Sequence, residues 1–309
     1  MKKILFIFII LLFNCHNAQN TGEMKIQQIP LEKQITYMID LTLKTPHELY
    51  INDILAVSRS RGSNAAIDIN PYVLKNGKYK IKLRLLPYWH LNETTVSKSD
   101  IENARLFFGS YIRNKETDEI LNYKADVALP IVAPKEDVPY FEQEWDVELT
   151  ELPYELEGWS KGQDLRKWDK KELEKKVVAY YQKLWRILNN GEDERWTKLT
   201  QKRINETAIF YYESEEENQK AIKNNQQNIV KYCTNMMIPL EDYEMKLYAE
   251  GKLVCLERKT HTKEFNNKSP LDIKGWSPLI RKGKKSGAGY YNVLLYLPQG
   301  SNEFVIIRK

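Results

Sequence analysis

The chain has 309 residues, of which 42% are hydrophobic, 29% charged and 11% aromatic, and its formal net charge is +5. This composition provides enough apolar side chains for buried cores and excludes a globally disordered or fibrous protein. At about 150 residues per domain, the length favours two domains. The sequence does not define one activity, but it indicates a cellular address, an architecture and several candidate binding surfaces.

The N-terminus has the pattern of an export signal. Lys2 and Lys3 precede an uninterrupted apolar run at positions 4–13. This run is too short to cross a bilayer, because a spanning helix needs about 20 apolar residues. A positive segment followed by such a run is typical of a secretory signal peptide, so we expect residues 1–14 to be one. Export places the chain at the outer membrane or in the periplasm of a Gram-negative bacterium.

Two cleavage sites remain open after this run. The segment Leu12-Phe13-Asn14-Cys15 resembles the lipobox of bacterial lipoproteins, in which a leucine and two mostly small residues precede a lipidated cysteine. The resemblance implies lipidation of Cys15 and a membrane anchor, although Phe13 and Asn14 are not the small residues of that motif. The alternative is cleavage after Ala18, a small residue suited to that position, which leaves no anchor.

The two remaining cysteines, Cys233 and Cys255, form an even pair if Cys15 carries lipid. An oxidising envelope would allow a disulfide between them, and closing their short loop would stabilise the fold by about 3 kcal/mol in the chain-entropy model. Both cysteines also have apolar neighbours, and the sequence favours two buried free thiols, because it cannot establish the geometry of a bridge.

Charge is divided unevenly along the chain. Residues 15–168 hold 19 Lys/Arg and 23 Asp/Glu, a net of −4, whereas residues 169–309 hold 26 and 19, a net of +7. This asymmetry indicates two parts with different surfaces, which could dock on each other. The alternative is that the charge difference reflects ordinary variation among solvent-exposed side chains and has no function.

Residues 24–151 have the period of β strands. The alternation over 79–85 follows Asn76-Gly77, a strong turn signal. Several short strands with turn signals between them predict an antiparallel β-sandwich of jelly-roll type. Pro153, Gly158 and Gly162 then mark 152–168 as a linker. Further strands are expected at 49–57, 65–69, 105–112, 120–129 and 140–149.

After residue 168 the period becomes helical. Asp169 and Glu172 form a capping-box pattern, and the acidic run after Ser214 suits the start of a second long helix. The expected buried stripe of the first helix is Leu173, Val177, Tyr181, Leu184 and Leu188, and that of the second is Ile222, Ile229, Val230, Cys233 and Met237.

A short helix is expected between them, carrying Trp196 and Leu199. Hairpins follow around Glu250-Gly251 and around residues 299–302, with an edge strand at 277–281. Helices followed by an antiparallel meander predict an α+β domain over 169–309. This element order resembles the NTF2-like superfamily, and a cystatin-like arrangement is nearly as close.

No catalytic constellation is found. The four histidines, His16, His47, His90 and His261, lack metal-ligand spacing, and there is no Cys-x-x-Cys and no Gly-x-Ser-x-Gly. The sequence therefore predicts no metal, no cofactor and no catalytic residue. The NTF2-like resemblance implies pocket enzymes in which a carboxylate works with Tyr or His donors. The candidates for that role are Asp242, Tyr243, Glu244 and Tyr248, with outward-facing charges as the alternative.

Two segments are candidate partner surfaces. The run Tyr88-Trp89-His90 follows a predicted strand, where exposed aromatics can stack on a sugar or dock a protein; a packed edge cluster is the alternative. The second surface is basic and invites phosphate or acidic partners, with a solvated loop as the alternative. Its cations are Arg281, Lys282, Lys284 and Lys285.

These features favour an exported cell-envelope binding or interaction protein without a recognisable catalytic site. Its partner would be a protein, a glycan or an anionic lipid, and nucleic acid is not expected because no recognition module is present. The alternatives are an exported enzyme with a pocket in the α+β domain, or an immunity-type protein that neutralises a toxin.

Overall fold

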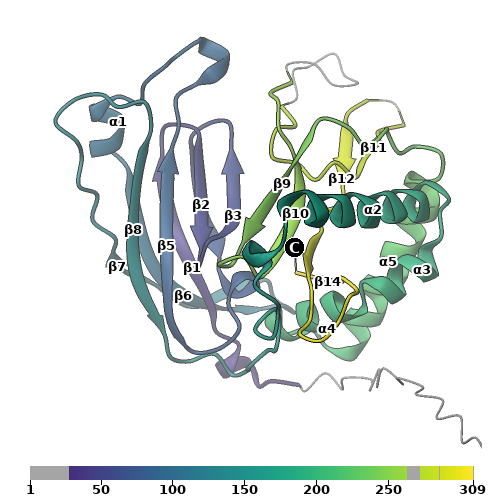
Figure 1. The fold of residues 1–309 in the computed structure, drawn as a ribbon. Helices are drawn as coiled ribbons and strands as arrows, with labels where there is room; N and C mark the ends of the chain where they lie inside the picture. Colours follow the sequence, from purple (N-terminus) through teal and green to yellow (C-terminus); the bar gives the residue numbers. More distant parts are fainter. Residues whose placement is uncertain (1–27, 263–271, 285, 309) are drawn as a thin grey trace, which may run out of the picture.

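The computed structural model describes residues 28–262, 272–284 and 286–308. This part of the chain is an α+β fold with three four-stranded antiparallel sheets, one two-stranded sheet and five α-helices (Figure 1). None of its helices is long and apolar enough to cross a membrane. The expected signal peptide, Cys15, Ala18 and Lys285 lie outside the described residues.

The first half forms two antiparallel sheets with the strand orders β4-β1-β6-β7 and β3-β2-β5-β8. Both sheets contribute to one buried cluster of apolar side chains. A short helix α1 (Lys98–Glu102) precedes β6. The strands are β1 (Thr36–Leu43), β2 (His47–Ile51), β3 (Ile54–Arg59), β4 (Ser63–Asp68), β5 (Gly77–Leu85), β6 (Arg105–Asn114), β7 (Glu119–Ala128) and β8 (Phe141–Leu149).

The prediction of one strand over 49–57 is wrong. The chain reverses at Asn52 and Asp53, with φ of 46° and 63°, so β2 and β3 form a hairpin. Asn and Asp are among the few non-glycine residues that adopt this left-handed conformation readily. The strands expected at 65–69, 79–85, 105–112, 120–129 and 140–149 are confirmed within a few residues as β4, β5, β6, β7 and β8.

Four helices follow in the second half, and the two predicted starts are confirmed. The Asp169 side chain accepts hydrogen bonds from the backbone N–H groups of Lys171 and Glu172 at 2.9 and 3.0 Å. Ser214 and Glu217 form a reciprocal capping box, which satisfies backbone donors that an open helix end leaves unpaired. The helices are α2 (Lys170–Asn189), α3 (Asp193–Leu199), α4 (Gln201–Phe210) and α5 (Glu215–Tyr232).

The buried stripe of α2 is confirmed in full, because all five of its predicted members are at most 1% exposed. That of α5 is partly wrong. Ile229 is fully buried, but the next residue, Val230, is 52% exposed. Successive helical residues are about 100° apart around the axis, and the inward direction at this point is taken by Ile229.

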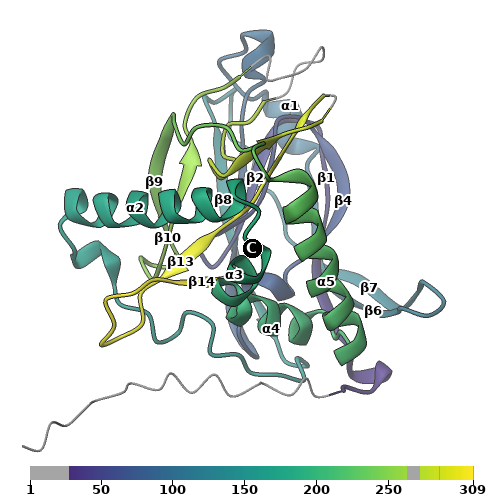
Figure 2. The ribbon, with the colours of Figure 1, turned by 90° about the vertical axis from the view of Figure 1, so that its right-hand side faces the viewer.

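The second half ends in an antiparallel sheet of order β14-β13-β10-β9 and a separate hairpin of β11 and β12. Helix α2 lies across this sheet (Figures 1 and 2). The buried Tyr181 hydroxyl of α2 donates to the Val293 carbonyl at 2.8 Å and accepts from the Leu256 N–H at 3.1 Å. The strands are β9 (Tyr243–Tyr248), β10 (Leu253–Arg258), β11 (Ile280–Lys282), β12 (Ala288–Tyr290), β13 (Leu294–Tyr296) and β14 (Val305–Ile307).

Residues 152–168 pack against both halves. The Leu156 N–H donates to the Leu74 carbonyl at 2.8 Å, and the Leu165 N–H donates to the Gly251 carbonyl at 2.9 Å. The largest buried cluster runs without interruption from β1 through this segment to β14. The segment's buried side chains are Leu152, Leu156, Trp159 and Leu165.

A buried ion pair also joins the two halves. Arg308 follows β14, and its Nε lies 3.3 Å from Glu206 Oε2 of α4, with both side chains only 2% exposed. Arg308 Nη1 donates to the carbonyls of Pro71 and Val73 at 2.8 and 2.9 Å. These acceptors lie in and after η2 (Asn70–Tyr72), which connects β4 to β5. The Arg308 side chain of the second half thus provides hydrogen-bond donors for backbone carbonyls of the first half.

Candidate functional site

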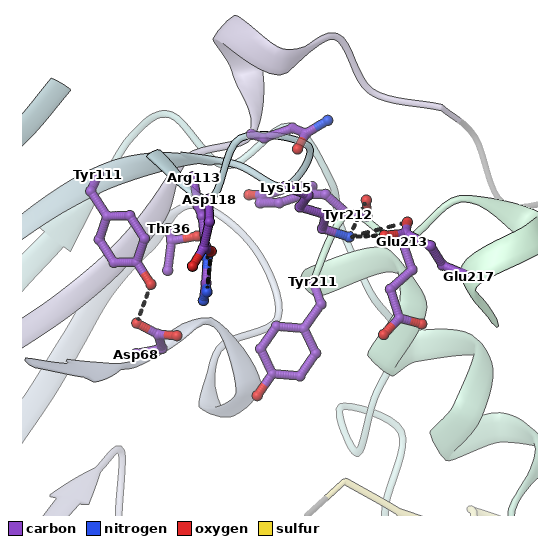
Figure 3. A pocket seen from close by; sticks show the side chains of 11 residues that line it. Thr36, Asp68, Tyr111, Arg113, Lys115, Asp118, Tyr211, Tyr212, Glu213 and Glu217 are labelled. Carbon is purple, nitrogen blue, oxygen red and sulfur yellow. Dashed lines mark hydrogen bonds and ion pairs between the residues drawn. The ribbon is translucent and has the colours of Figure 1, made fainter. Parts of the chain in front are cut away.

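A hollow of about 380 Å³ lies between the sheet β4-β1-β6-β7 and the helices α4 and α5 (Figure 3). The sheet and the β6–β7 turn provide one wall, and the turn between the two helices provides the other. Its lining is polar and aromatic. The lining residues are Gln34, Thr36, Asp68, Tyr111, Arg113, Lys115, Asp118, Tyr211, Tyr212, Glu213 and Glu217.

On the sheet wall, the Tyr111 hydroxyl donates a 2.8 Å hydrogen bond to Asp68 Oδ1. The pairing register brings them together, because Asp68 lies opposite Met38 of β1 and Tyr111 lies opposite Thr36. Those positions are two residues apart and therefore share a face of the sheet. Burial raises the pKa of Asp68, and the Tyr111 hydrogen bond and the Arg113 charge oppose this only in part.

On the helical wall, the turn after α4 is held by Tyr212, which has a φ of 55°. Its hydroxyl donates to the Ile35 carbonyl at 2.5 Å. This contact fixes the positions of Tyr211 and Glu213 on either side. Burial raises the pKa of Glu213. Burial also raises the pKa of Tyr211, and the negative charges of Asp68 and Glu213 raise it further. Both carboxyl groups therefore act on the same phenol.

Two of the four carboxylates in the hollow are neutralised by cations. Arg113 Nε lies 2.8 Å from Asp118 Oδ1, and Lys115 Nζ lies 3.3 Å from Glu217 Oε2. Neither Asp68 nor Glu213 forms an ion pair with any residue of the described part. The hollow therefore has an excess of negative charge at two partly desolvated carboxyl groups, which suits a ligand that brings hydrogen-bond donors or a positive charge.

A second hollow of about 600 Å³ adjoins the first. Residues 28–31, at the start of the described chain, form one of its walls. It shares with the first hollow Gln34, Lys115, Tyr212, Glu213 and Glu217. The Lys115 ammonium, which also donates to the Tyr212 carbonyl at 3.0 Å, stands at this shared wall.

The four residues suggested by the NTF2-like resemblance are not assembled as a carboxylate with donors around either hollow. Asp242 pairs with Arg258 at 3.3 Å and accepts from the Thr260 hydroxyl, a contact that lowers its pKa. Glu244 pairs with Lys246 at 2.8 Å.

Of the other two, Tyr243 is half-buried, and the buried Tyr248 donates to Glu257 at 2.7 Å. Asp242 and Glu244 are therefore paired with neighbouring cations, and both are half-buried.

The aromatic run joins the two halves of the molecule. The Trp89 ring stacks on His261 with centroids 4.2 Å apart and planes inclined by 22°. The Tyr88 hydroxyl donates to the Lys44 carbonyl at 2.6 Å. His90 packs edge-on against both rings and is exposed. Tyr88 and Trp89 thus have packing partners, and His90 remains open to solvent.

The side chains of the basic segment do not form one surface, because β11 directs them to two faces of the β11–β12 hairpin. Arg281 lies opposite Gly289 in the β11–β12 pair, and Lys282 lies opposite Ala288, so their side chains point to opposite faces. Arg281 and Lys284 approach the ring of Tyr232 at the end of α5. The structure therefore groups two of the predicted cations with a helix that the sequence did not connect to them.

Cys233 and Cys255 are both buried, and neither forms a disulfide. Cys233 Sγ is hydrogen-bonded to the Tyr291 hydroxyl at 2.9 Å, and Cys255 Sγ lies 3.7 Å from Glu257 Oε1. They have different partners, and the candidate disulfide is not formed.

Within the described residues, no group of three or more His, Cys, Asp or Glu side chains could hold a metal ion. His47 is buried and hydrogen-bonded to Ser63 and to the Thr45 carbonyl. Comparisons with protein-family models, with curated proteins and with solved structures found no match for this chain. The functional argument therefore depends on the geometry of the hollow.

Proposed function

We propose that this chain is an exported binding protein that holds a small, amine-bearing ligand in the hollow between β4-β1-β6-β7 and α4–α5. The observation that carries the proposal is the pair of partly desolvated carboxyl groups, Asp68 and Glu213, which line this space and form no ion pair with a described residue, although the charges of Arg113 and Lys115 act on them from nearby. An ammonium group bound in the hollow adds the positive charge that neither carboxyl group has in an ion pair, and desolvated charge pairs interact more strongly than exposed ones.

The other lining groups suit the rest of such a ligand. The Tyr211 ring lies between the Asp68 and Glu213 side chains in Figure 3 and offers its face to a cation. Thr36, Tyr111 and Gln34 provide hydroxyl and amide groups for hydrogen bonds. A volume of about 380 Å³ lies in the range of small-molecule sites, about 300–1,000 Å³.

The subcellular localisation is also part of the proposal. We infer a signal peptide at 1–14 and lipid on Cys15, which would place the site at the outer membrane, or cleavage after Ala18, which would release it into the periplasm. The binding site itself does not depend on which of the two occurs.

The finer architecture is likewise proposed. Residues 24–151 would be a β-sandwich of jelly-roll type, and residues 169–309 an NTF2-like unit. Two separate sheet orders in the first part and four helices before the last sheet support this. Because 152–168 and Arg308 pack against both parts, we infer that they fold as one cooperative unit.

Calorimetric titration with glucosamine, glucose and putrescine tests the ligand class. The two amines should bind, and glucose should bind at least tenfold more weakly because it brings no charge. Asp68→Asn and Glu213→Gln should each weaken amine binding by about tenfold or more. Glu216→Gln, an exposed change on α5, is the matched control and should bind like the parent. Equal binding of glucose and glucosamine, or equal effects of all three substitutions, would refute the proposal.

An exported enzyme is the second candidate, and one observation favours it. Asp68 and Glu213 both have pKa values raised by burial and face one hollow, an arrangement suited to a general acid and base. The same variants separate the two functions. Loss of turnover of an amino sugar glycoside with retained binding would favour catalysis, whereas loss of binding alone favours a binding protein.

A further inference from the structure

Three cations gather around one half-buried tyrosine, Tyr232, which is the last residue of α5 and lies at the opposite end of this helix from Glu217 in the hollow. Lys231 Nζ, Arg281 Cζ and Lys284 Nζ lie 4.9, 5.3 and 5.6 Å from the centroid of the Tyr232 ring. We call these four residues the Tyr232 cluster. They come from the end of α5 and from the β11–β12 hairpin, which the isolated bridge between Met237 and Arg281 holds beside it.

Two glycines give the hairpin the shape that places these cations. A Cβ at Gly283 would lie 2.0 Å from the Ser286 carbonyl oxygen, so the tight turn before Lys284 requires glycine. A Cβ at Gly289 would lie 3.1 Å from Cζ and Nη2 of Arg281. The Arg281 guanidinium group therefore packs against the backbone of Gly289 and reaches the Tyr232 ring from there.

Among the residues that the structure describes, no carboxylate neutralises the cluster. No described Asp or Glu forms an ion pair with Lys231, Arg281 or Lys284. Other cations of the chain, such as Lys115, Lys202, Arg258 and Arg308, do have a carboxylate partner. The three charges also lower the pKa of the Tyr232 phenol, with the Lys231 hydrogen bond as the largest cause. Like charges held this close repel one another, and an anion between them removes that repulsion.

We propose that the Tyr232 cluster is a binding site for a phosphate group. Phosphate oxygens accept several charge-assisted hydrogen bonds at once, and the cluster offers one guanidinium, two ammonium groups and one phenol as donors. The phosphate can belong to a soluble phosphate compound or to the headgroup of an anionic lipid. This inference does not depend on the amine site, because the two sites share no residue.

The test has two arms and uses the chain from residue 15 onward with Cys15→Ser, so that no lipid is attached. One arm titrates inorganic phosphate by calorimetry. The other measures sedimentation with vesicles of phosphatidylcholine, with and without 30% phosphatidylglycerol. Binding in the first arm identifies a soluble phosphate as sufficient, and binding only to the anionic vesicles identifies the lipid headgroup. Either result supports the site, provided that the variants below abolish it.

The decisive variant is Lys231→Ser/Arg281→Ser/Lys284→Ser. Near an anionic surface each cation contributes about fivefold to binding, so the triple change should weaken it on the order of 100-fold. The matched control removes three exposed lysines of α2, as Lys170→Ser/Lys171→Ser/Lys175→Ser. It changes the net charge equally and should bind within about threefold of the parent.

Gly289→Ala is a second variant that keeps every charge. Its Cβ would lie 3.1 Å from the Arg281 guanidinium, which must shift by a few tenths of an ångström, so binding should weaken by less than the roughly fivefold loss expected for removing one cation. Circular dichroism of each variant checks the fold. The proposal is overturned if the parent binds neither phosphate nor anionic vesicles, or if the control weakens binding as much as the cluster variant does.

Discussion

Arg308→Met is expected to destabilise the whole fold, because it removes one half of a buried ion pair. The substitution deletes the hydrogen bonds from Nη1 to the Pro71 and Val73 carbonyls and the contact of Nε with Glu206. The methionine can still pack against Phe210 and Trp159, whose rings lie 4.7 and 5.3 Å from the guanidinium carbon. Most of the apolar contact therefore survives, and the loss is electrostatic.

The magnitude follows from what remains buried. Glu206 keeps one donor, the Gly158 N–H at 3.0 Å, and otherwise becomes an unpaired carboxylate. Removing one partner of such a pair costs about 3–5 kcal/mol, out of a total stability of about 5–15 kcal/mol for a typical domain. Adding Glu206→Gln removes the stranded charge and keeps the acceptor for Gly158. The double variant should therefore recover about 1–3 kcal/mol relative to Arg308→Met at pH 7.

Urea unfolding followed by tryptophan fluorescence and by circular dichroism measures these differences. The control is Arg195→Met, which removes an exposed ion pair with Glu192 and should change stability by less than about 1 kcal/mol. A cost below about 1 kcal/mol for Arg308→Met, or a double variant less stable than the single one, would refute the reasoning. Two separate transitions in the parent would show that the halves do not share one cooperative core.

Three further predictions concern other parts of the chain. Burial raises the pKa values of Asp68 and Glu213, so their contribution to stability is present below the pKa of the unfolded carboxyl groups, about 4, and is lost as the pH rises through the raised folded values. Asp68→Asn and Glu213→Gln should therefore gain stability relative to the parent between pH 4 and 7, as thermal unfolding at several pH values would show; an unchanged difference would contradict this. Ser214→Ala removes the α5 capping box and should cost about 0.5–2 kcal/mol, whereas Ser160→Ala should cost less, in the same urea assay. Mass spectrometry of the exported chain should find lipid on Cys15, and a free N-terminus at Gln19 would contradict the anchor.

Local chemistry made much of the fold predictable. The side chains of Asp169 and Ser214 cap the helices that follow them, and the alternation over 79–85 reports one buried face of β5. Such signals depend on neighbours within four residues. The reversal at Asn52-Asp53 was missed because two left-handed residues occur there without the glycine that usually marks such a turn.

The hollow could not be predicted in the same way. Asp68 and Tyr111 are 43 positions apart, and they meet only because both pair with β1 in a particular register. Glu213 reaches the site from a turn fixed by the contact of Tyr212 with Ile35, 177 positions away. The clustering of Tyr211, Tyr212 and Glu213 was the one local sign, and it resembles any polar helix end. Lys231 was likewise unconnected to the basic segment until the hairpin was placed beside α5.

The contact of Arg308 with Val73 has a consequence for the order of events during biosynthesis. The two residues are 235 positions apart, and a ribosome adding about 5–20 residues per second needs roughly 12–47 s to make the chain between them. Throughout that interval the carbonyls of the β4–β5 connection have no guanidinium, and Glu206, once made, has no counter-ion. The contacts that join the end of β14 to the β4–β5 connection therefore form only after nearly the whole chain has been made.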